Sequence, residues 1–353
     1  NPDTQPFESK ERGYYFVPQW NVLPYLEQVS QRTNTPGNEK YIDELLTIIK
    51  EVTDYHVKHG KVLDNNRTWF YFVKILLNIP NNKIPLEIID FIPVWLDSKF
   101  NSTLQGSEIA IKLLPKFLTD NPEDIKKAEK IIDYITAFKP VPLNEERAKL
   151  LGRKEEFRFV IDPHWLDEAF DKYSESIGEK CSENVIKDLA SKIRSLLTSE
   201  EDETYKSFYE EAEYPESEPL EVLTSILKRI LLVKAKNDIN TTQGILKDYF
   251  KDKYLYFPKM ALYVIGQNID KYSELFWEVL NTETGDLMME KSLYWGDELK
   301  HLLENLKNFT DEYRKTLNKK IEGATKKHAF KEDQERDTAL YKQEIYQALS
   351  HDS

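Results

Sequence analysis

The stretch EKYIDELLTIIKEVTDYHVKHG, residues 39–60, decides the fold class. Its apolar side chains recur every three or four residues, the spacing that places them on one face of an α-helix. The stripe consists of Ile42, Leu45, Leu46, Ile49, Val52 and His56. Gly60 suits the end of such a helix, because glycine adopts a positive φ without a steric penalty. We therefore expect an amphipathic helix over residues 39–59 that buries one face.

The next stretch, residues 67–78, is apolar nearly all round and predicts the buried partner of that helix. The same signals recur along the chain: Pro and Asn or Asp at starts, apolar stripes, and short polar links. Further helices are expected from Val22, over 85–96, from a cap at Ser107 to 118, over 122–135, from Pro163, from a cap at Ser182 to 197, and over 218–236, 241–251, 258–268, 271–281, 295–307 and 310–323.

Composition agrees with a helical array. Charged residues make up 31% of the chain and hydrophobic residues 40%, and an array of amphipathic helices keeps more surface wet than a compact globule does. Glycine occurs only 11 times in 353 residues, which disfavours an α/β nucleotide-binding fold with its glycine-rich turns.

Two helix pairs carry a resemblance to a known architecture. Leu114–Leu118 is followed by 122–138, and Pro258–Leu262 is followed by 272–280, so helices joined by short links follow one another in pairs. In this the chain resembles HEAT and armadillo α-solenoids. The resemblance implies an irregular α-solenoid of antiparallel helix pairs whose concave face binds other proteins, and it implies no chemistry.

The rhythm is interrupted twice. Residues 139–162 begin with two prolines and include Phe157–Ile161, which predicts a short strand near 156–161 in an otherwise all-α chain. Residues 198–219 form an acidic block, expected to be an exposed loop. The predicted organisation is an irregular arm (1–21), a helical region (22–138), a junction (139–162), a second helical region (163–323) and a polar tail (324–353). We expect function at the two interruptions.

Net charge excludes some classes of function. At −13, the chain lacks the surplus of Lys and Arg that phosphate contacts require, so nucleic-acid binding is not expected. A single cysteine excludes an internal disulfide. There is no signal peptide or membrane-length apolar run, which favours a cytoplasmic protein. The chain opens on Asn1-Pro2, so we expect a segment of a larger multidomain protein.

Histidines and the cysteine are candidates for chemistry. His56 and His59 are spaced i, i+3 and could offer two ligands to a metal, but no further ligands accompany them, so no metal or cofactor is predicted. His164 falls in the first turn of a predicted helix among acids, which leaves open an enzyme with a site near 139–164. Cys181 has no activating neighbour, and no phosphate-loop, dinucleotide or serine-hydrolase motif occurs.

Aromatic and acidic side chains are the candidates for binding. Tyr14, Tyr15 and Trp20 lie in or beside the N-terminal arm and either pin it to the first helix pair or form part of a binding surface. Glu210, Glu211 and Glu213 lie in the acidic block and would attract a partner protein with a basic surface. The sequence therefore predicts an interaction scaffold or sensor, with the helical enzyme as the alternative.

Overall fold

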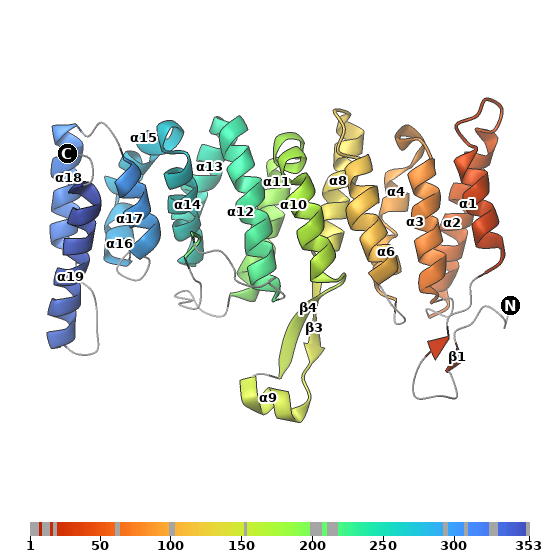
Figure 1. Cartoon of the computed structure of the whole chain (residues 1–353), viewed down its shortest axis with the longest axis horizontal. Helices are drawn as coiled ribbons and strands as arrows, with labels where there is room; N and C mark the ends of the chain where they lie inside the picture. Colours follow the sequence, from red (N-terminus) through yellow and green to blue (C-terminus); the bar gives the residue numbers. More distant parts are fainter. Residues whose placement is uncertain are drawn as a thin grey trace. The chain divides into compact units, whose positions relative to one another are not determined.

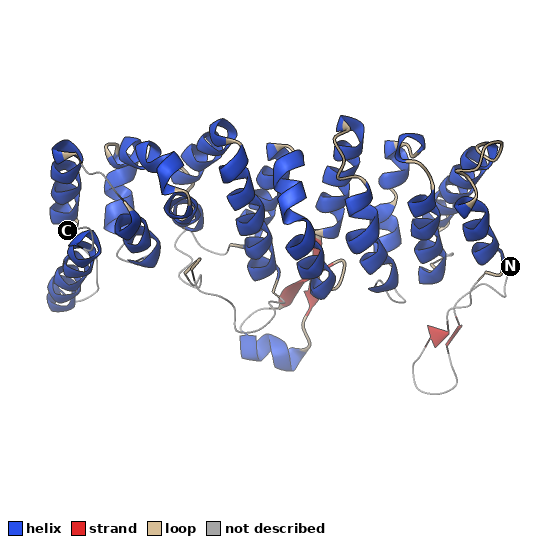
Figure 2. Ribbon diagram, turned by 45° about the horizontal axis from the view of Figure 1, so that its top comes forward, coloured by secondary structure: helices blue, strands red, loops and turns tan. Residues whose placement is uncertain are grey.

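The computed structural model describes residues 7–8, 15–16, 20–60, 64–98, 103–151, 154–197, 207–209, 218–291, 296–306, 310–324 and 331–350. Helices form almost all of this structure, and strands occur only as two short ribbons (Figures 1 and 2). The predicted all-α fold with a short β element is confirmed. The chain divides into two compact units, Asn1–Lys192 with Pro215–Arg229 and Ile193–Tyr214 with Ile230–Ser353. Residues 139–162 therefore lie inside the first unit.

The first unit begins with the helices that the sequence predicts most clearly. A two-residue ribbon, β1 (Phe7–Glu8) and β2 (Tyr15–Phe16), precedes α1 (Val22–Gln31). The helix predicted over 39–59 is α2 (Lys40–Lys58), and the one predicted over 67–78 is α3 (Asn66–Asn78), which packs chiefly on α1. Ile49 of α2 and Trp69 and Phe72 of α3 are all buried, and the His56 ring of α2 meets Trp69 edge-on. Gly60 follows α2 at φ 68°, as its role in ending the helix requires.

The next segment contains shorter helices than the sequence predicts. A 3₁₀ turn, η2 (Asn81–Lys83), is followed by two short helices, α4 (Leu86–Ile89) and α5 (Ile92–Leu96), in place of one helix over 85–96. Pro93 explains the break, because proline is tolerated in a first turn but not inside a helix.

The prediction that Ser107 caps a helix is wrong. Ser107 lies inside α6 (Thr103–Glu108) and its hydroxyl donates to the carbonyl of Leu104. The helix continues through a π turn, η3 (Ile109–Leu113), into α7 (Leu114–Lys116). The π turn alters the carbonyl pattern of the helix, and the Tyr173 hydroxyl donates to the carbonyl of Ile111 at 3.1 Å.

The remaining helices of the first unit start where their capping residues indicate. Asn121 caps α8 (Pro122–Ile135) and Asp162 caps α10 (Pro163–Lys180), each accepting a main-chain N–H at 3.0 Å. Ser182 precedes α11 (Glu183–Leu196). Between α8 and α10 the chain forms β3 (Phe138–Pro142), α9 (Glu145–Leu151) and β4 (Glu155–Phe159). β4 confirms the expected short strand, whereas β3 and α9 were not predicted.

The second unit surrounds α14 (Tyr256–Gln267), which is buried on nearly every side. It packs against α13 (Ile239–Phe250), α15 (Ile269–Leu280) and α17 (Gly296–Asn305). α12 (Pro219–Asn237) contributes its last turns, and α16 (Glu283–Lys291) and α18 (Asp311–Gly323) complete this region.

The tail expected to be polar contains α19 (Lys331–Ser350). This helix packs on α17 and α18 and buries Tyr341, Ile345 and Ala348. Among the described residues, no helix combines the length and apolar character that crossing a membrane requires.

Candidate functional site

Most of the predicted binding residues lie outside the described part of the chain. This holds for Tyr14, Glu210, Glu211 and Glu213. Tyr15 belongs to β2, opposite Glu8. Trp20 is half-buried before α1, and its carbonyl accepts the Leu23 N–H at 3.0 Å. The two alternatives for the N-terminal aromatic residues therefore stay open.

The two histidines of α2 have different surroundings. His56 is buried, and its ring meets Trp69 edge-on with 5.1 Å between ring centroids. His59 ends the helix, stacks on Tyr55, and places Nδ1 2.8 Å from the Tyr55 carbonyl. Within the described ranges, no three His, Cys, Asp or Glu side chains gather as metal ligands. His56 thus belongs to the apolar core and His59 to the helix end.

His164 and Cys181 lie at opposite ends of α10. His164 lies in the first turn of α10, and its Nε2 is 3.8 Å from a carboxylate oxygen of Glu168, with both side chains exposed to solvent. Cys181 is buried at the end of α10. The exposed pair of His164 and Glu168 thus lacks the desolvation that a general base uses.

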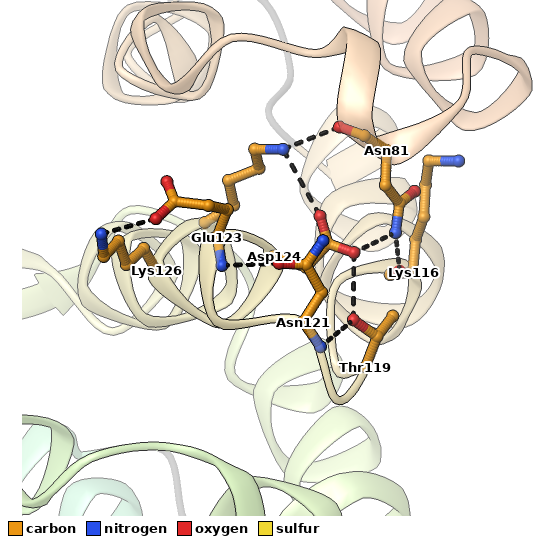
Figure 3. Close-up of polar contacts among 8 residues, drawn as sticks. Asn81, Lys116, Thr119, Asn121, Glu123, Asp124 and Lys126 are labelled. Atoms are coloured by element: carbon orange, nitrogen blue, oxygen red, sulfur yellow. Dashed lines mark hydrogen bonds and ion pairs between the residues drawn. The ribbon is translucent and has the colours of Figure 1, made fainter.

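A buried polar cluster joins η2, α7 and α8 in the first unit (Figure 3). Asp124 accepts from the Asn81 amide at 2.9 Å and from the Thr119 hydroxyl at 3.0 Å, and its other oxygen is 3.4 Å from Lys127 Nζ. Lys127 also donates to the Asn81 carbonyl at 2.7 Å, and the Asn81 amide reaches the Lys116 carbonyl at 2.8 Å.

The polar groups of this cluster are directed at one another rather than at an open site. Burial of an ion pair costs free energy that only such additional hydrogen bonds offset. Burial also lowers the pKa of Lys116, with Asp124 opposing and Lys127 adding to the effect. The Asp124 cluster is therefore best explained as a structural joint between successive helices.

The second candidate is formed by β3, α9 and β4, residues 138–159. We call this segment the arm; it is distinct from the N-terminal arm over residues 1–21. In Figure 1 it extends away from the row of helices of the first unit. β3 and β4 pair antiparallel, with Phe138 opposite Phe159 and Pro140 opposite Phe157. Asn144 caps α9 by accepting the Arg147 N–H at 2.8 Å, and the Leu143 N–H closes the ribbon on the Lys154 carbonyl.

The two faces of the arm differ in polarity. One face carries Glu156, which is buried and pairs with Arg158 of its own strand and with Arg147 of α9 at 3.6 Å. The opposite face, which we call the apolar face, carries Phe138, Pro140, Pro142, Phe157 and Phe159, with Glu155 at its end opposite Pro142. α9 thus contributes to the charged face, and Pro140, Pro142 and Phe157 stay exposed on the apolar face. Phe157 is 36% exposed although it meets Phe138 edge-on.

The two edges of the ribbon also differ. Leu143 and Val160 donate across the ribbon to Lys154 and Ala137, so residues 139 and 141 face inward and 140 and 142 face outward. The outward positions of β3 are prolines, which lack an N–H. On β4 the outward main-chain groups belong to Glu155, Phe157 and Phe159. In the described part of the chain no third strand covers this edge.

A third candidate lies in the second unit, where the acidic block meets α14 and α17. Ser207, Phe208 and Tyr209, which we call the docked tripeptide, are not an exposed loop: Phe208 is only 2% exposed and Ser207 is buried. The expectation of exposure for the acidic block is wrong for these residues. Phe208 packs edge-on against Tyr256, and Tyr209 packs against Tyr263 and His301.

Glu298 holds the docked tripeptide by its main chain and its hydroxyl. One carboxylate oxygen accepts the Phe208 N–H at 2.6 Å and the Ser207 hydroxyl at 3.0 Å. The other oxygen is 3.6 Å from Lys259 Nζ. Glu298 is fully buried, and this burial raises its pKa, while Lys259 and the hydrogen bonds from the tripeptide oppose the shift.

Local sequence patterns do not predict this contact. The one signal was an apolar pair, Phe208-Tyr209, inside a run of acids. Glu298 itself falls in the first turn of α17, where an acid is usual because it interacts favourably with the helix dipole.

No model of a known protein family matches the chain, and neither a curated protein nor a solved structure shows significant similarity to it.

Proposed function

We propose that this chain is an interaction scaffold of the α-solenoid type, whose first unit presents the arm to a partner protein. The observation that carries the proposal is the open edge of β4 beside the exposed Phe157, on a ribbon whose other edge is closed by Pro140 and Pro142. Natural proteins usually block or cover exposed strand edges, so an edge left open next to an aromatic side chain indicates a place for another strand.

The partner segment would be extended and would alternate apolar with polar side chains. An added strand hydrogen-bonds to the outward groups of Glu155 and Phe157, and every second side chain then lies on the apolar face beside Phe157. Leu150 of α9, 83% exposed, offers a further apolar contact close in sequence to this strand. Main-chain bonds supply affinity here, and the apolar side chains supply selection.

The acidic block provides a second, electrostatic contribution in this proposal. Glu210, Glu211 and Glu213 follow the docked tripeptide directly in sequence, and a chain of net charge −13 attracts basic surfaces. Charges at the rim of an interface act mainly on the association rate and lose their effect at high salt. We therefore propose a partner whose strand-forming segment is accompanied by a basic surface.

Site-specific photo-crosslinking tests the proposal. A photoreactive amino acid replaces Leu150 in the full chain, and a matched control carries it at Tyr25, an exposed aromatic residue of α1. We expect a discrete adduct with one protein from position 150 only. The adduct is identified, the partner is purified, and its dissociation constant for the chain is measured.

Two variants then separate the contributions. Phe157→Pro removes an outward N–H. It should therefore weaken the binding of the purified partner at least tenfold at any salt concentration. Glu210→Gln combined with Glu211→Gln and Glu213→Gln should slow association at low salt only. Equal adducts from positions 150 and 25, or an unchanged dissociation constant with Phe157→Pro, would contradict the proposal.

A further inference from the structure

The docked tripeptide is bound in the manner of a peptide ligand. The tripeptide stands in an acidic stretch of sequence, with Glu200 to Glu203 a few residues before it and Glu210, Glu211 and Glu213 after it, yet Ser207 and Phe208 are buried. Phe208 fills an aromatic environment formed by Tyr256 and Tyr263 of α14. A single buried aromatic anchor with a polar surround is the usual anatomy of a short recognition motif.

The polar contacts of the tripeptide involve its main chain as well as a side chain. The Phe208 N–H and the Ser207 hydroxyl converge on one oxygen of Glu298, ninety residues away along the chain. Lys259 lies beside the other oxygen of that carboxylate. The Glu298 side chain that binds the tripeptide is therefore itself paired with a cation. Hydrogen bonds to a charged acceptor are stronger than neutral ones and require good geometry.

Gly266 leaves room for Tyr209, the third residue of the docked tripeptide, because glycine has no side chain. A Cβ atom built on Gly266 would lie 2.7 Å from the Tyr209 hydroxyl oxygen, closer than any real contact. Gly266 is the penultimate residue of α14, in the last turn of the helix. This glycine therefore allows the Tyr209 ring to approach the helix.

We propose that the second unit contains a peptide-binding site, formed by Glu298, Lys259, Gly266 and the aromatic residues of α14, which Ser207–Tyr209 occupies in cis. A partner segment with a hydroxyl residue followed by two aromatic residues is the external ligand that the same groups would accept. The tripeptide then acts as an internal competitor. The site goes beyond the proposed scaffold function and shares no residue with the arm.

The affinity expected in trans follows from this competition. A tethered ligand sees an effective concentration of roughly millimolar order, so the free site is only a small fraction of the population. The apparent dissociation constant of an external peptide rises by the inverse of that fraction. Removing the anchor side chains of the tripeptide should therefore reveal binding that the wild-type chain conceals.

Fluorescence anisotropy tests this with a labelled peptide, ETYKSFYEEAE, which is residues 203–213 of the chain. The receptor is the full chain carrying Phe208→Ala and Tyr209→Ala, with folding verified by circular dichroism. We expect saturable binding to this receptor and at least tenfold weaker binding to the wild-type chain. The matched control peptide, in which alanine replaces the phenylalanine, should not bind, and Glu298→Gln in the receptor should weaken binding about tenfold.

The outcomes are decisive in each direction. A folded receptor that shows no saturable binding overturns the proposal, and so does equal affinity for the receptor and the wild-type chain. If the double variant does not fold, the single Phe208→Ala variant takes its place. If that variant also fails to fold, the tripeptide is an indispensable part of the core, which overturns the proposal too. None of these results affects the test at Leu150 and Phe157.

Discussion

The main-chain N–H of Phe208 donates to the Glu298 carboxylate at 2.6 Å, joining residues that lie ninety positions apart. It is a hydrogen bond to a fully buried carboxylate, whose raised pKa reflects its loss of water. This contact makes the stability of the second unit sensitive to pH in a predictable direction.

Replacement of Glu298 by Gln should change the pH dependence of unfolding. Burial raises the folded-state pKa above the unfolded value, so the folded protein binds more protons between the two values. The contribution of Glu298 is therefore fully present below its unfolded pKa and is lost as pH rises through the folded pKa. Denaturant titrations of both proteins across that window should show a wild-type minus variant difference that falls with rising pH. A constant difference would contradict the assignment.

Gly266→Ala should lower the free energy of unfolding by about 1–3 kcal/mol, because the new methyl group would displace the Tyr209 hydroxyl. Tyr209→Phe in the same chain removes the hydroxyl oxygen and should restore part of the loss. Gly244→Ala is the matched control: it lies in α13 with nothing within 4 Å of the added Cβ, so it should stabilise by about 0.5–1 kcal/mol. Urea unfolding compares the variants, and equal effects at the two glycines would rule out the close approach.

Lys127→Met should lower the free energy of unfolding by about 3 kcal/mol, since it removes the cation that is paired with the buried Asp124 carboxylate. The control is Lys126→Met in the same helix. Its pair with Glu123 is exposed on both sides, with Lys126 59% exposed, and exposed pairs contribute within about 0.5 kcal/mol. Thermal melts of the two variants should therefore separate clearly, and similar melts would show that the cluster in Figure 3 is not a stabilising joint.

Phe157→Pro and Arg158→Pro should affect the arm differently although they are neighbours. Residue 157 directs its N–H outward, and residue 158 directs its N–H toward β3. Hydrogen exchange of the Leu143 and Val160 amides, which bond across the ribbon, should keep its protection in the first variant and lose it in the second. Arg158→Ala separates loss of the ion pair with Glu156 from loss of the main-chain bond. Equal exchange in both proline variants would show that the register is different.

Local patterns were sufficient for much of the framework. The stripe from Ile42 to His56 predicted α2, and Asn121 and Asp162 predicted the starts of α8 and α10, because these signals depend only on neighbouring residues. Ser107 misled for the same reason: a serine inside a helix can bond to a carbonyl of the preceding turn, and sequence does not distinguish this from a cap. α19 was missed because its few buried residues are spread along a strongly polar helix.

The candidate sites were located only coarsely from sequence. Both interruptions of the helical rhythm, 139–162 and 198–219, contain features that we now consider functional. However, the open edge of β4 depends on which positions face β3, and the fate of Phe208 depends on Glu298. Register and long-range pairing arise from tertiary packing, which periodicity does not encode.

The prolines of β3 limit how many molecules can join through the arm. Fibril growth by strand addition needs two edges with available N–H groups, whereas this ribbon offers one. Two copies could pair edge to edge through β4, and a third would then find only Pro140 and Pro142. In the proposed function, the arm would therefore accept one strand per chain without seeding a polymer.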